Sequence, residues 1–486
     1  MNYSLFIIIL ISVLSQQVEP VAEKKPNIVF ILVDDLGKEW ISTYGAEDVT
    51  TPHIDALARS GTSFNNVYSM PQCTPTRLTL LTGQYPFRHG WVNHWDVPRW
   101  GGQAHFDETK HPSLGAEMKK AGYRTCVVGK WQIDDFRVEP DAMTRAGFDE
   151  YCMWTGWEEG NDPSQERYFD PYIFTKEGSK TYKGEFGPDI FSDFIVSFIK
   201  ERKKELNAAR PFFVYYPMVL THTPFTDTPD EKADTPLGKH KAMVRYTDKI
   251  VGKLVTALTE AGLLENTIIV FTTDNGTTSA ISGRYNGRLV KGGKAHTTEN
   301  GICEPFIVSW KNHIEPDTKS EALIDFSDIF PTFLDLAGMK VGKTWRSDGA
   351  THIVDGRSFK QALLKSTDRS KRSWILGMGG GNNARLTEKG VENKYKFRDR
   401  VVRNERYKLY IDSNRKPEKF IDLREDPEEK INLLDSLTNG ERKANFSKLM
   451  AVVKSFPEKD SDPKYRLNPV QPWDVEVTAE SQVWKK

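Results

Sequence analysis

Apolar residues gather in five short, nearly uninterrupted runs along the chain. The two clearest, residues 27–33 and residues 267–273, end directly at acidic or amide side chains, and three further runs span residues 124–128, 211–220 and 305–310. Continuous apolarity, rather than alternation with polar residues, is typical of strands that are buried on both faces of a parallel sheet. We therefore predict that these runs are strands of one central sheet.

Helical patterns separate these runs. They cover residues 188–204, 241–261 and 325–337, and Thr51 followed by Pro52 is typical of a further helix start. Strands that alternate with helices predict an α/β fold, with a large mixed, mostly parallel sheet sandwiched by helices. In such folds, ligands bind beyond the carboxyl ends of the strands.

The pattern changes after about residue 370. A glycine-rich loop at residues 377–381 precedes short apolar segments at residues 400–403, 407–411 and 420–423. These segments predict short antiparallel strands. We therefore expect a main α/β domain over residues 25–370 and, over residues 371–486, a smaller C-terminal subdomain with an antiparallel sheet and a helix.

The N-terminus predicts export. Residues 5–14 form an apolar run that is too short to span a bilayer but typical of a signal peptide. We predict a signal peptide over residues 1–22 and a secreted or periplasmic mature protein without stable membrane insertion. Because no Lys or Arg precedes the run, a buried N-terminal strand is the alternative.

Composition excludes some classes of protein. The 486 residues carry 67 basic and 67 acidic side chains, so no overall field attracts nucleic acid, and any anion must be recognised by a local cluster. Four cysteines in so long a chain do not make a disulfide framework. Cys126 is expected in the core. Cys152 and Cys303 are expected either to be buried as well or to form a disulfide with each other.

Four side chains with hard oxygen atoms follow the two clearest strands. Asp34 and Asp35 come after the first strand, and Asp274 and Asn275 come after the other. Such oxygens suit Ca²⁺ or Mg²⁺, and carboxylates crowded at one edge of a sheet repel each other without a cation. A helix cap at the first pair, or an Asn-Gly turn at the second, explains each pair when it is taken alone.

Cys73 begins the most specific motif of the chain. Cys73 and Arg77 are the ends of the pattern C-x-P-x-R, which continues to Leu-Leu-Thr-Gly at residues 80–83. The motif resembles the signature of type I sulfatases, and residues 122–131 resemble their second signature. This resemblance, which covers residues 25–434, implies an alkaline-phosphatase-like fold and a cysteine that a maturation enzyme oxidises to formylglycine.

The resemblance also implies the site. It gives the metal ligands as Asp34, Asp35, Asp274, Asn275 and the formylglycine made from Cys73, and the catalytic residues as Cys73, Arg77, Lys130, His222 and Lys294. Ca²⁺ is favoured over Mg²⁺. In this scheme Arg77 supports the metal site and binds formylglycine, the two lysines hold the sulfate, and His222 protonates the leaving alcohol.

The chain departs from the family pattern at Gln132. The family usually has a histidine there, which takes a proton so that sulfate can leave, and glutamine cannot take a proton at useful pH. Asn300, Cys303 and Glu304 also depart from the pattern that follows the second lysine. Attack on the substrate is therefore better supported than release of sulfate.

Aromatic and basic residues indicate the substrate. Residues 91–100 are rich in tryptophan, and Trp154, Trp157 and Tyr168 follow. Aromatic rings can stack on sugar faces, although packing in the core or in loops explains them equally well. Predicted substrate-binding residues are Gln132, His94, Trp95, Arg99 and Arg288.

These observations predict a sulfuric ester hydrolase that acts on a sulfated carbohydrate. One alternative is a phosphatase or phosphonate monoester hydrolase of the same superfamily. The other is a protein that binds sulfated glycans with impaired catalysis, which Gln132 suggests.

Overall fold

The computed structural model describes residues 25–93, 104–155, 167–204, 210–347, 349–365, 372–437, 440–462, 465–467 and 476–485. The signal peptide expected over residues 1–22 lies outside these ranges. Within them, no helix is long and apolar enough to cross a membrane.

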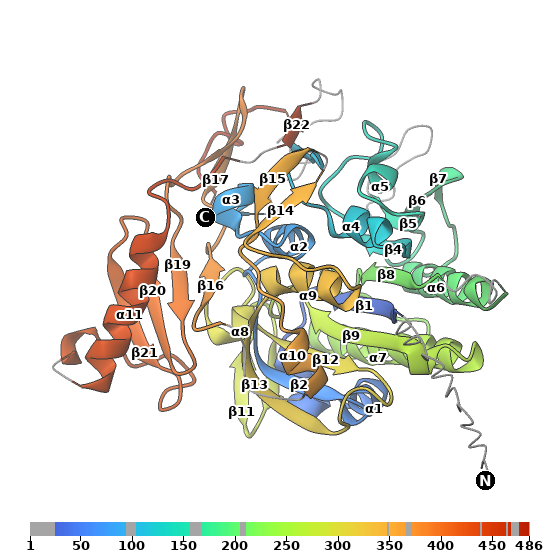
Figure 1. Ribbon diagram of the computed structural model, residues 1–486, viewed down its shortest axis with the longest axis horizontal. Helices are drawn as coiled ribbons and strands as arrows, with labels where there is room; N and C mark the ends of the chain where they lie inside the picture. The colour runs from blue at the N-terminus through green and yellow to red at the C-terminus, as the bar shows by residue number, and fades with distance from the viewer. Residues whose placement is uncertain are drawn as a thin grey trace, which may run out of the picture.

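A ten-stranded sheet forms the centre of the molecule (Figure 1). β1 (Asn27–Val33) lies between β8 (Phe212–Pro217) and β9 (Thr267–Thr273), runs parallel to both and is buried throughout. β4 (Arg124–Lys130) and β5 (Glu150–Trp154) extend the parallel part beyond β8. The prediction of a large, mostly parallel sheet is confirmed.

Both edges of this sheet contain antiparallel pairs. β12 (Cys303–Ser309) runs antiparallel to β9 and to β2 (Thr62–Tyr68), and β13 (Thr318–Asp325) is parallel to β2. β6 (Tyr172–Thr175) and β7 (Gly178–Thr181) form the other edge. β12 runs antiparallel to both neighbours although residues 305–310 form a nearly uninterrupted apolar run, because such a run reports burial on both faces and not strand direction.

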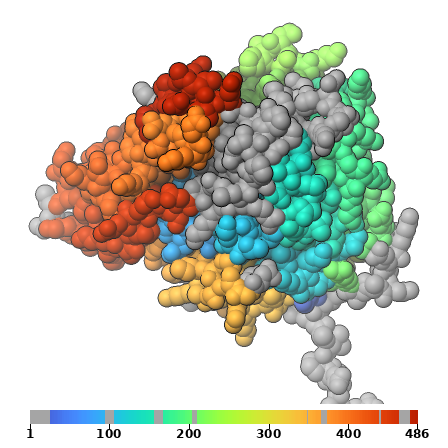
Figure 2. Space-filling view, turned by 90° about the horizontal axis from the view of Figure 1, so that it is seen from above, coloured from blue at the N-terminus to red at the C-terminus, as the bar shows by residue number. Residues whose placement is uncertain are grey.

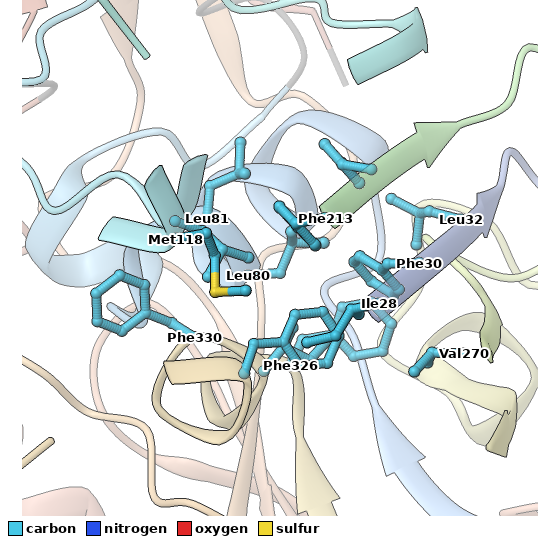
Figure 3. Close-up of a cluster of buried hydrophobic side chains, with 14 of the residues drawn as sticks. Ile28, Phe30, Leu32, Leu80, Leu81, Met118, Phe213, Val270, Phe326 and Phe330 are labelled. Atoms are coloured by element: carbon cyan, nitrogen blue, oxygen red, sulfur yellow. The ribbon is translucent and has the colours of Figure 1, made fainter. Parts of the chain in front are cut away.

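Helices cover both faces of the sheet, since alternate residues of a strand point to opposite sides. The even-numbered residues Ile28, Phe30 and Leu32 of β1 pack with α2 (Cys73–Thr82), α4 (Leu114–Lys120) and α9 (Ile329–Leu336), as Figure 3 shows in part. The odd-numbered residues pack with α1 (Pro52–Arg59), α6 (Gly187–Lys204) and α7 (Pro236–Glu260). α7 begins earlier than predicted because the Thr235 side chain caps it, accepting a hydrogen bond from Gly238 N.

The C-terminal part has its own antiparallel sheet, as predicted. Its strand order is β16 (Ile375–Met378), β19 (Arg400–Arg403), β20 (Tyr407–Ile411) and β21 (Pro417–Asp422), and α11 (Glu441–Ser455) packs on it. This part lies to the left in Figure 1. The limits of the two domains stay a prediction.

Short elements complete the described fold. They are the strand pairs β10 (Ser282–Tyr285) with β11 (Arg288–Lys291), β14 (Thr344–Ser347) with β15 (Ala350–Ile353), β17 (Ala384–Thr387) with β18 (Gly390–Asn393) and β3 (Ala104–Phe106) with β22 (Tyr465–Leu467), and the helices α3 (Pro86–His89), α5 (Ala142–Arg145), α8 (Glu299–Ile302) and α10 (Lys360–Lys365). All four cysteines are free, so the pairing of Cys152 with Cys303 does not occur in this structure.

Candidate active site

Cys73 is the first residue of α2, and it is only 3% exposed. The Thr76 hydroxyl donates to the carbonyl oxygen of Gln72 at 2.9 Å and accepts a hydrogen bond from Met70 N at 3.1 Å. These contacts fix the chain on both sides of the turn into the helix. Because the N-terminus of a helix carries partial positive charge, position 73 favours a group that is or becomes anionic.

The four predicted oxygen ligands meet where β1 and β9 end. Val33 lies opposite Thr273 in the parallel pair, so Asp34 and Asp35 come next to Asp274 and Asn275, and all four are buried. Asp35 has a φ of 61°, in the left-handed region. This turn breaks the alternation of an extended strand, which lets two consecutive carboxylates face one site.

Hydrogen bonds tie the two strand ends together. The Asp35 amide donates to Asp274 Oδ1 at 3.2 Å, and Asn275 Nδ2 donates to Asp35 Oδ1 at 2.8 Å. One oxygen each of Asp34 and Asp274 and the sulfur of Cys73 all lie within 4.8 Å of one another. The nucleophile position and the carboxylates therefore form one cluster.

The residues of this cluster fit a divalent cation. Within the described part of the chain, Asp34 Oδ1 and Asn275 Oδ1 are buried and accept no hydrogen bond. Buried polar oxygens of this kind are unfavourable unless something positive contacts them. Three carboxylates and an amide oxygen are ligands that Ca²⁺ and Mg²⁺ prefer.

Arg77 and Lys130 compensate part of the negative charge. Arg77 Nη2 lies 2.6 Å from Asp274 Oδ2 and 3.8 Å from Asp34 Oδ2, and its Nη1 donates to the carbonyl oxygen of Lys130 at 2.9 Å. Lys130 Nζ donates to Asp34 Oδ2 at 2.7 Å. Lys130 ends β4 after Gly129, where a Cβ would lie 2.1 Å from the carbonyl oxygen of Pro217. Glycine thus allows β4 and β8 to approach closely just before the lysine.

Lys294 enters the site from a loop. Its Nζ donates to Asp35 Oδ2 at 2.5 Å, and the side chain is 22% exposed. The loop is held tightly, since a Cβ on Gly292 would lie 2.1 Å from the carbonyl oxygen of Thr278. Lys294 is therefore carried by a loop that packs closely against the segment after β9 and not by a free surface loop.

The charges of the cluster shift its pKa values in opposite directions. Burial alone would raise the pKa of Asp34, but the positive charges of Lys130, Arg77 and Lys294 outweigh it and hold that pKa well below its usual range. For Asp274, burial and then the charge of Asp34 raise the pKa to about 7. The protein's own cations therefore do not fully compensate the carboxylates at neutral pH.

His222 follows β8 and faces the same cluster. Its Nε2 lies 3.6 Å from Asp35 Oδ2, and its Nδ1 lies 2.5 Å from the carbonyl oxygen of Thr223, to which it donates. Burial, then the charges of Lys294 and Lys130, lower the pKa of His222 well below its usual value. Without substrate, the imidazole is therefore neutral, with its Nε2 turned to the site.

Gln132 lies two residues beyond β4 in a left-handed conformation with a φ of 72°. Its Oε1 is buried and accepts no hydrogen bond from the described residues. The nearby carboxylates are already engaged: Asp134 accepts hydrogen bonds from Trp131 Nε1 at 2.7 Å and from Phe106 N at 3.0 Å, and Asp135 accepts one from Arg137 Nε at 2.9 Å. Both carboxylates are therefore held by hydrogen bonds of their own.

The predicted substrate residues are only partly described. His94, Trp95, Arg99 and Trp157 lie outside the described residues. Arg288 is in β11, with its Nη1 3.4 Å from Glu428 Oε1, and lines a cavity of ≈ 950 Å³ that none of the catalytic candidates lines. Its role in binding stays a prediction.

Two of the predicted aromatic residues are structural. Tyr168 is 1% exposed, and its hydroxyl donates to the carbonyl oxygens of Val219, at 2.9 Å, and His222. Trp154 is 8% exposed, with the Arg167 guanidinium 4.3 Å from its ring centre. Tyr168 holds the segment that carries His222 and does not offer a face to a sugar.

Glu304 is a buried acid that sequence reasoning marked only as a departure from the family pattern. It accepts hydrogen bonds from Ser69 Oγ at 3.0 Å and Thr273 Oγ1 at 2.8 Å, and burial raises its pKa well above its usual value. It therefore ties the ends of β2 and β9 together beneath the site.

Asn382 is a second residue that sequence reasoning missed. Its Oδ1 accepts a hydrogen bond from Gln72 Nε2 at 3.3 Å, directly before the nucleophile position. Gly381 N donates to Ala295 O at 3.0 Å, next to Lys294. The glycine-rich loop of the C-terminal part is visible in the sequence, but its contact with the site depends on the fold.

Comparison with known proteins identifies the family. The Sulfatase family model matches residues 26–339. The chain belongs to the sulfatase family. It is 32% identical over 365 residues to the N-acetylgalactosamine-6-sulfatase of Rattus norvegicus, covering 71% of this chain and 67% of that one. It is 29% identical over 482 residues to the N-acetylgalactosamine-6-O-sulfatase of Bacteroides thetaiotaomicron, covering 84% and 90%.

Solved structures share the fold of this sulfatase. The crystal structure of Ps i-CgsB matches with a TM-score of 0.73 and 24% identity, over 91% of this chain and 94% of that one. The phosphonate monoester hydrolase of Agrobacterium radiobacter matches with a TM-score of 0.63 and 17% identity, over 88% and 95%. The sulfatase is thus a sulfuric ester hydrolase on a fold that other ester hydrolases share.

Proposed function

We propose that this sulfatase hydrolyses the sulfate ester of a carbohydrate, using a formylglycine made from Cys73 and a bound divalent cation. The observation that carries the proposal is the position of Cys73 at the start of α2, within 4.8 Å of the oxygens of Asp34 and Asp274. The formylglycine, when hydrated, supplies the nucleophilic hydroxyl, and the cation supplies positive charge near the sulfuryl oxygens.

Asp34, Asp35, Asp274 and Asn275 would hold the cation. Two adjacent strand ends supply all four side chains, so their oxygens are preorganised. We favour Ca²⁺ because it accepts many protein oxygens in a flexible geometry, whereas Mg²⁺ keeps several waters and demands an octahedral site.

Arg77, Lys130 and Lys294 would stabilise the negative charge of the sulfate. Each is held by a carboxylate of the cluster, at 2.6, 2.7 and 2.5 Å respectively. A charge that is already positioned needs no reorganisation when the substrate reacts. Each lysine also has further N–H groups, because an ammonium carries three donors and one is directed at its carboxylate.

His222 would donate a proton to the departing alcohol. Its Nδ1–H is committed to Thr223 O, so Nε2 is the atom that exchanges a proton with the substrate. The pKa of His222 is low in the free protein, and the negative charge of an arriving sulfate ester favours the protonated ring. Binding of substrate thus prepares the acid.

The substrate class is inferred from the relatives. Two of them are named for the 6-sulfate of N-acetylgalactosamine, which makes this sugar the first substrate to test. The apolar start of the chain supports secretion or a periplasmic location, where sulfated polysaccharides are accessible. The maturation enzyme that makes formylglycine is the implied protein partner.

The decisive experiment combines mass spectrometry with a sulfate-release assay. Protein produced together with a formylglycine-generating enzyme is expected to carry formylglycine at position 73 and to release sulfate from 4-nitrophenyl sulfate or N-acetylgalactosamine 6-sulfate. Full activity with an unmodified Cys73 would exclude the mechanism. Cys73→Ala is the matched inactive control.

Gln132 supports a second candidate function, that of a sulfated-glycan-binding protein with impaired catalysis. Its buried Oε1 can accept a hydrogen bond, but it cannot take the proton of the usual histidine. Confirmed formylglycine without sulfate release from any sulfated sugar, but with tight binding of one, would favour this candidate. Release of inorganic phosphate in preference to sulfate would instead favour a phosphatase or phosphonate monoester hydrolase.

A further inference from the structure

The C-terminal part contains a cavity that is connected to the nucleophile position by a short series of contacts. The cavity has a volume of ≈ 840 Å³ and is lined by residues of the β17–β18 hairpin, by Tyr395, Lys396 and Arg398, by residues 459–462, and by Val92 and Gln482. Cavities of this size accommodate several sugar rings or a drug-sized ligand. We refer to it as the hairpin cavity.

Arg398 joins the hairpin cavity to the active site. It lines the cavity and is 1% exposed, and its guanidinium donates to the carbonyl oxygens of Asn382 at 2.8 Å and of Gly380 and Gly381 at 3.0 Å each. The Asn382 side chain in turn contacts Gln72 beside Cys73. One buried side chain therefore separates the cavity from the loop that borders the nucleophile.

The segment that follows α2 also contacts the walls of this cavity. Asn93 Nδ2 donates to Asn393 Oδ1 of β18 at 2.8 Å, and Ser461 N donates to Phe87 O at 2.9 Å. In Figure 2 the blue surface from the early part of the chain lies against the orange and red surface of the C-terminal part. The cavity is thus formed at the junction between the catalytic helix region and the C-terminal part.

The lining carries positive charge that is not compensated. Among the described residues, Lys389 and Lys396 make no ion pair, and both are exposed. The other charges mostly cancel: Arg385 pairs with Glu392 at 2.7 Å and Lys459 with Asp462 at 2.8 Å, while Asp460 pairs with Arg400 at 2.8 Å. Glu388 is the one carboxylate of the lining that has no ion-pair partner among the described residues.

The lining also carries groups that suit a sugar. Tyr395 is half-buried in it, with the Lys394 ammonium 5.2 Å from the centre of its ring, and the Nδ2 group of Asn393 adds an amide donor to the lining. Two free ammonium groups, an aromatic ring and amide groups are the side chains that bind an acidic sugar.

We propose that the hairpin cavity is a binding site for an anionic sugar unit of a sulfated oligosaccharide, at a distance from the sulfate ester that is cleaved. Lys389 and Lys396 contact a sulfate or carboxylate group of that unit, and Tyr395 stacks on its ring. This inference rests on the proposed function, because it assigns the cavity to the same substrate. It makes the enzyme selective for chains over single sulfated sugars.

The test uses the double variant Lys389→Ala/Lys396→Ala and a hexasaccharide of alternating glucuronic acid and 6-sulfated N-acetylgalactosamine. The matched control is Lys443→Ala/Lys448→Ala on α11, which removes two exposed lysines that do not line the cavity. We expect KM for the hexasaccharide to rise roughly 3- to 20-fold with kcat unchanged, since each such contact contributes a fraction of a kcal/mol to about 1 kcal/mol. The rise shrinks at high ionic strength.

Kinetics with 4-nitrophenyl sulfate separate this inference from the proposed function. The small ester does not reach the cavity, so both double variants keep the wild-type kcat and KM for it. An unchanged KM for the hexasaccharide, or an equal rise in the α11 control, overturns the inference while the sulfatase function stands.

Binding tests the cavity independently of turnover. Titration calorimetry compares the hexasaccharide on Cys73→Ala with the same variant carrying both lysine substitutions. A Kd that weakens by a similar factor supports the cavity even where no sulfate is released and the proposed function fails. No measurable binding to Cys73→Ala overturns the inference.

Discussion

At the scale of single residues, the site is a set of opposite charges that hold one another in place. The nearest basic side chains to Asp34, Asp35 and Asp274 are Lys130, Lys294 and Arg77, and two oxygens of the cluster stay without a hydrogen-bond donor among the described residues. In the proposed function, a divalent cation would supply positive charge to these oxygens and the sulfate ester negative charge to the basic side chains. His222 adds a neutral imidazole whose protonation depends on what is bound.

The proposed role of His222 as an acid predicts a dependence on the leaving group. For His222→Ala we expect kcat to fall roughly 10²- to 10⁴-fold with N-acetylgalactosamine 6-sulfate, because an alkoxide is a poor leaving group that needs a proton. With 4-nitrophenyl sulfate the fall is much smaller, since 4-nitrophenolate leaves without one. Steady-state kinetics on the two substrates check this.

His313→Ala is the control for that variant, because His313 is an exposed histidine outside the site. Equal losses on both substrates would contradict the acid role and indicate that His222 only shapes the site.

The raised pKa of Asp274 predicts that cation binding depends on pH. Because burial raises the pKa of Asp274 to about 7, the carboxylate is mostly ionised at higher pH, whereas at lower pH a cation would have to displace a proton from it. We therefore expect added Ca²⁺ to raise the Tm more at pH 8 than at pH 5.5. Thermal unfolding with Ca²⁺ and with a chelator measures both shifts.

In Asp274→Asn the difference between the two pH values should shrink, because that side chain no longer titrates. A Ca²⁺-induced shift that is the same at both pH values in the wild type would argue against Asp274 as a ligand.

At the scale of elements, the site depends on how strands and one helix end. The polar residues of the site follow the carboxyl ends of β1, β4, β8 and β9. Left-handed backbone conformations at Asp35 and Gln132 direct their side chains toward the site, whereas an extended strand would direct them away. α2 presents its N-terminus to the same place. The Thr76 side chain is what fixes the start of that helix.

The hydroxyl of Thr76 is therefore expected to matter for both stability and activity. Thr76→Val keeps the size of the side chain but removes its hydrogen bonds to Met70 and Gln72. We expect the free energy of unfolding to fall by about 1–3 kcal/mol, because the Met70 amide loses its buried acceptor. Urea unfolding measures this loss, and KM and kcat report the movement of position 73.

Thr259→Val is the comparison. Thr259 is exposed on α7, where its hydroxyl donates to Val255 O at 2.8 Å, so we expect a change within about 0.5 kcal/mol. Similar losses in the two variants would mean that the Thr76 contacts have no special importance.

At the scale of the whole molecule, the C-terminal part completes the site from outside the central sheet. The loop at residues 379–383 forms hydrogen bonds to Gln72 and Ala295. A small cluster of apolar side chains also joins β16 to β2 and β13. A buried ion pair adds to this junction: Arg372 Nε lies 2.5 Å from Asp328 Oδ2, and its Nη1 lies 2.9 Å from the Tyr85 hydroxyl.

Removing that ion pair should loosen the junction. Arg372→Met leaves the Asp328 carboxylate buried without its cation, and we expect the free energy of unfolding to fall by about 3–5 kcal/mol. Denaturant unfolding measures it, and sulfate release from 4-nitrophenyl sulfate reports whether the active-site loop moves. Arg372→Lys retains a positive charge and should lose less. Stability equal to the wild type in Arg372→Met would contradict the importance of this contact.

Much of the fold was predictable, because burial on two faces leaves a local mark in the sequence. The bounds of β1 and β9 agree with the apolar runs, and β4, β8 and the start of α1 lie where the patterns place them. Strand direction in β12 was not predictable, since an antiparallel strand between two helical layers is just as apolar. The start of α7 depends on a cap that the apolar pattern does not report.

The sequence by itself determined the kinds of chemical group in this sulfatase: a cysteine in a specific motif, paired carboxylates after strands, two lysines and a histidine. Each of these signals depends on residues that are neighbours in the sequence, so it can be recognised without the fold. Only the tertiary structure decided that the groups meet, that Tyr168 holds the His222 segment rather than a sugar, and that Asn382 and Arg398 connect a distant cavity to Cys73. Those contacts join residues separated by tens to hundreds of positions, and sheet order and packing, which no short pattern encodes, bring them together.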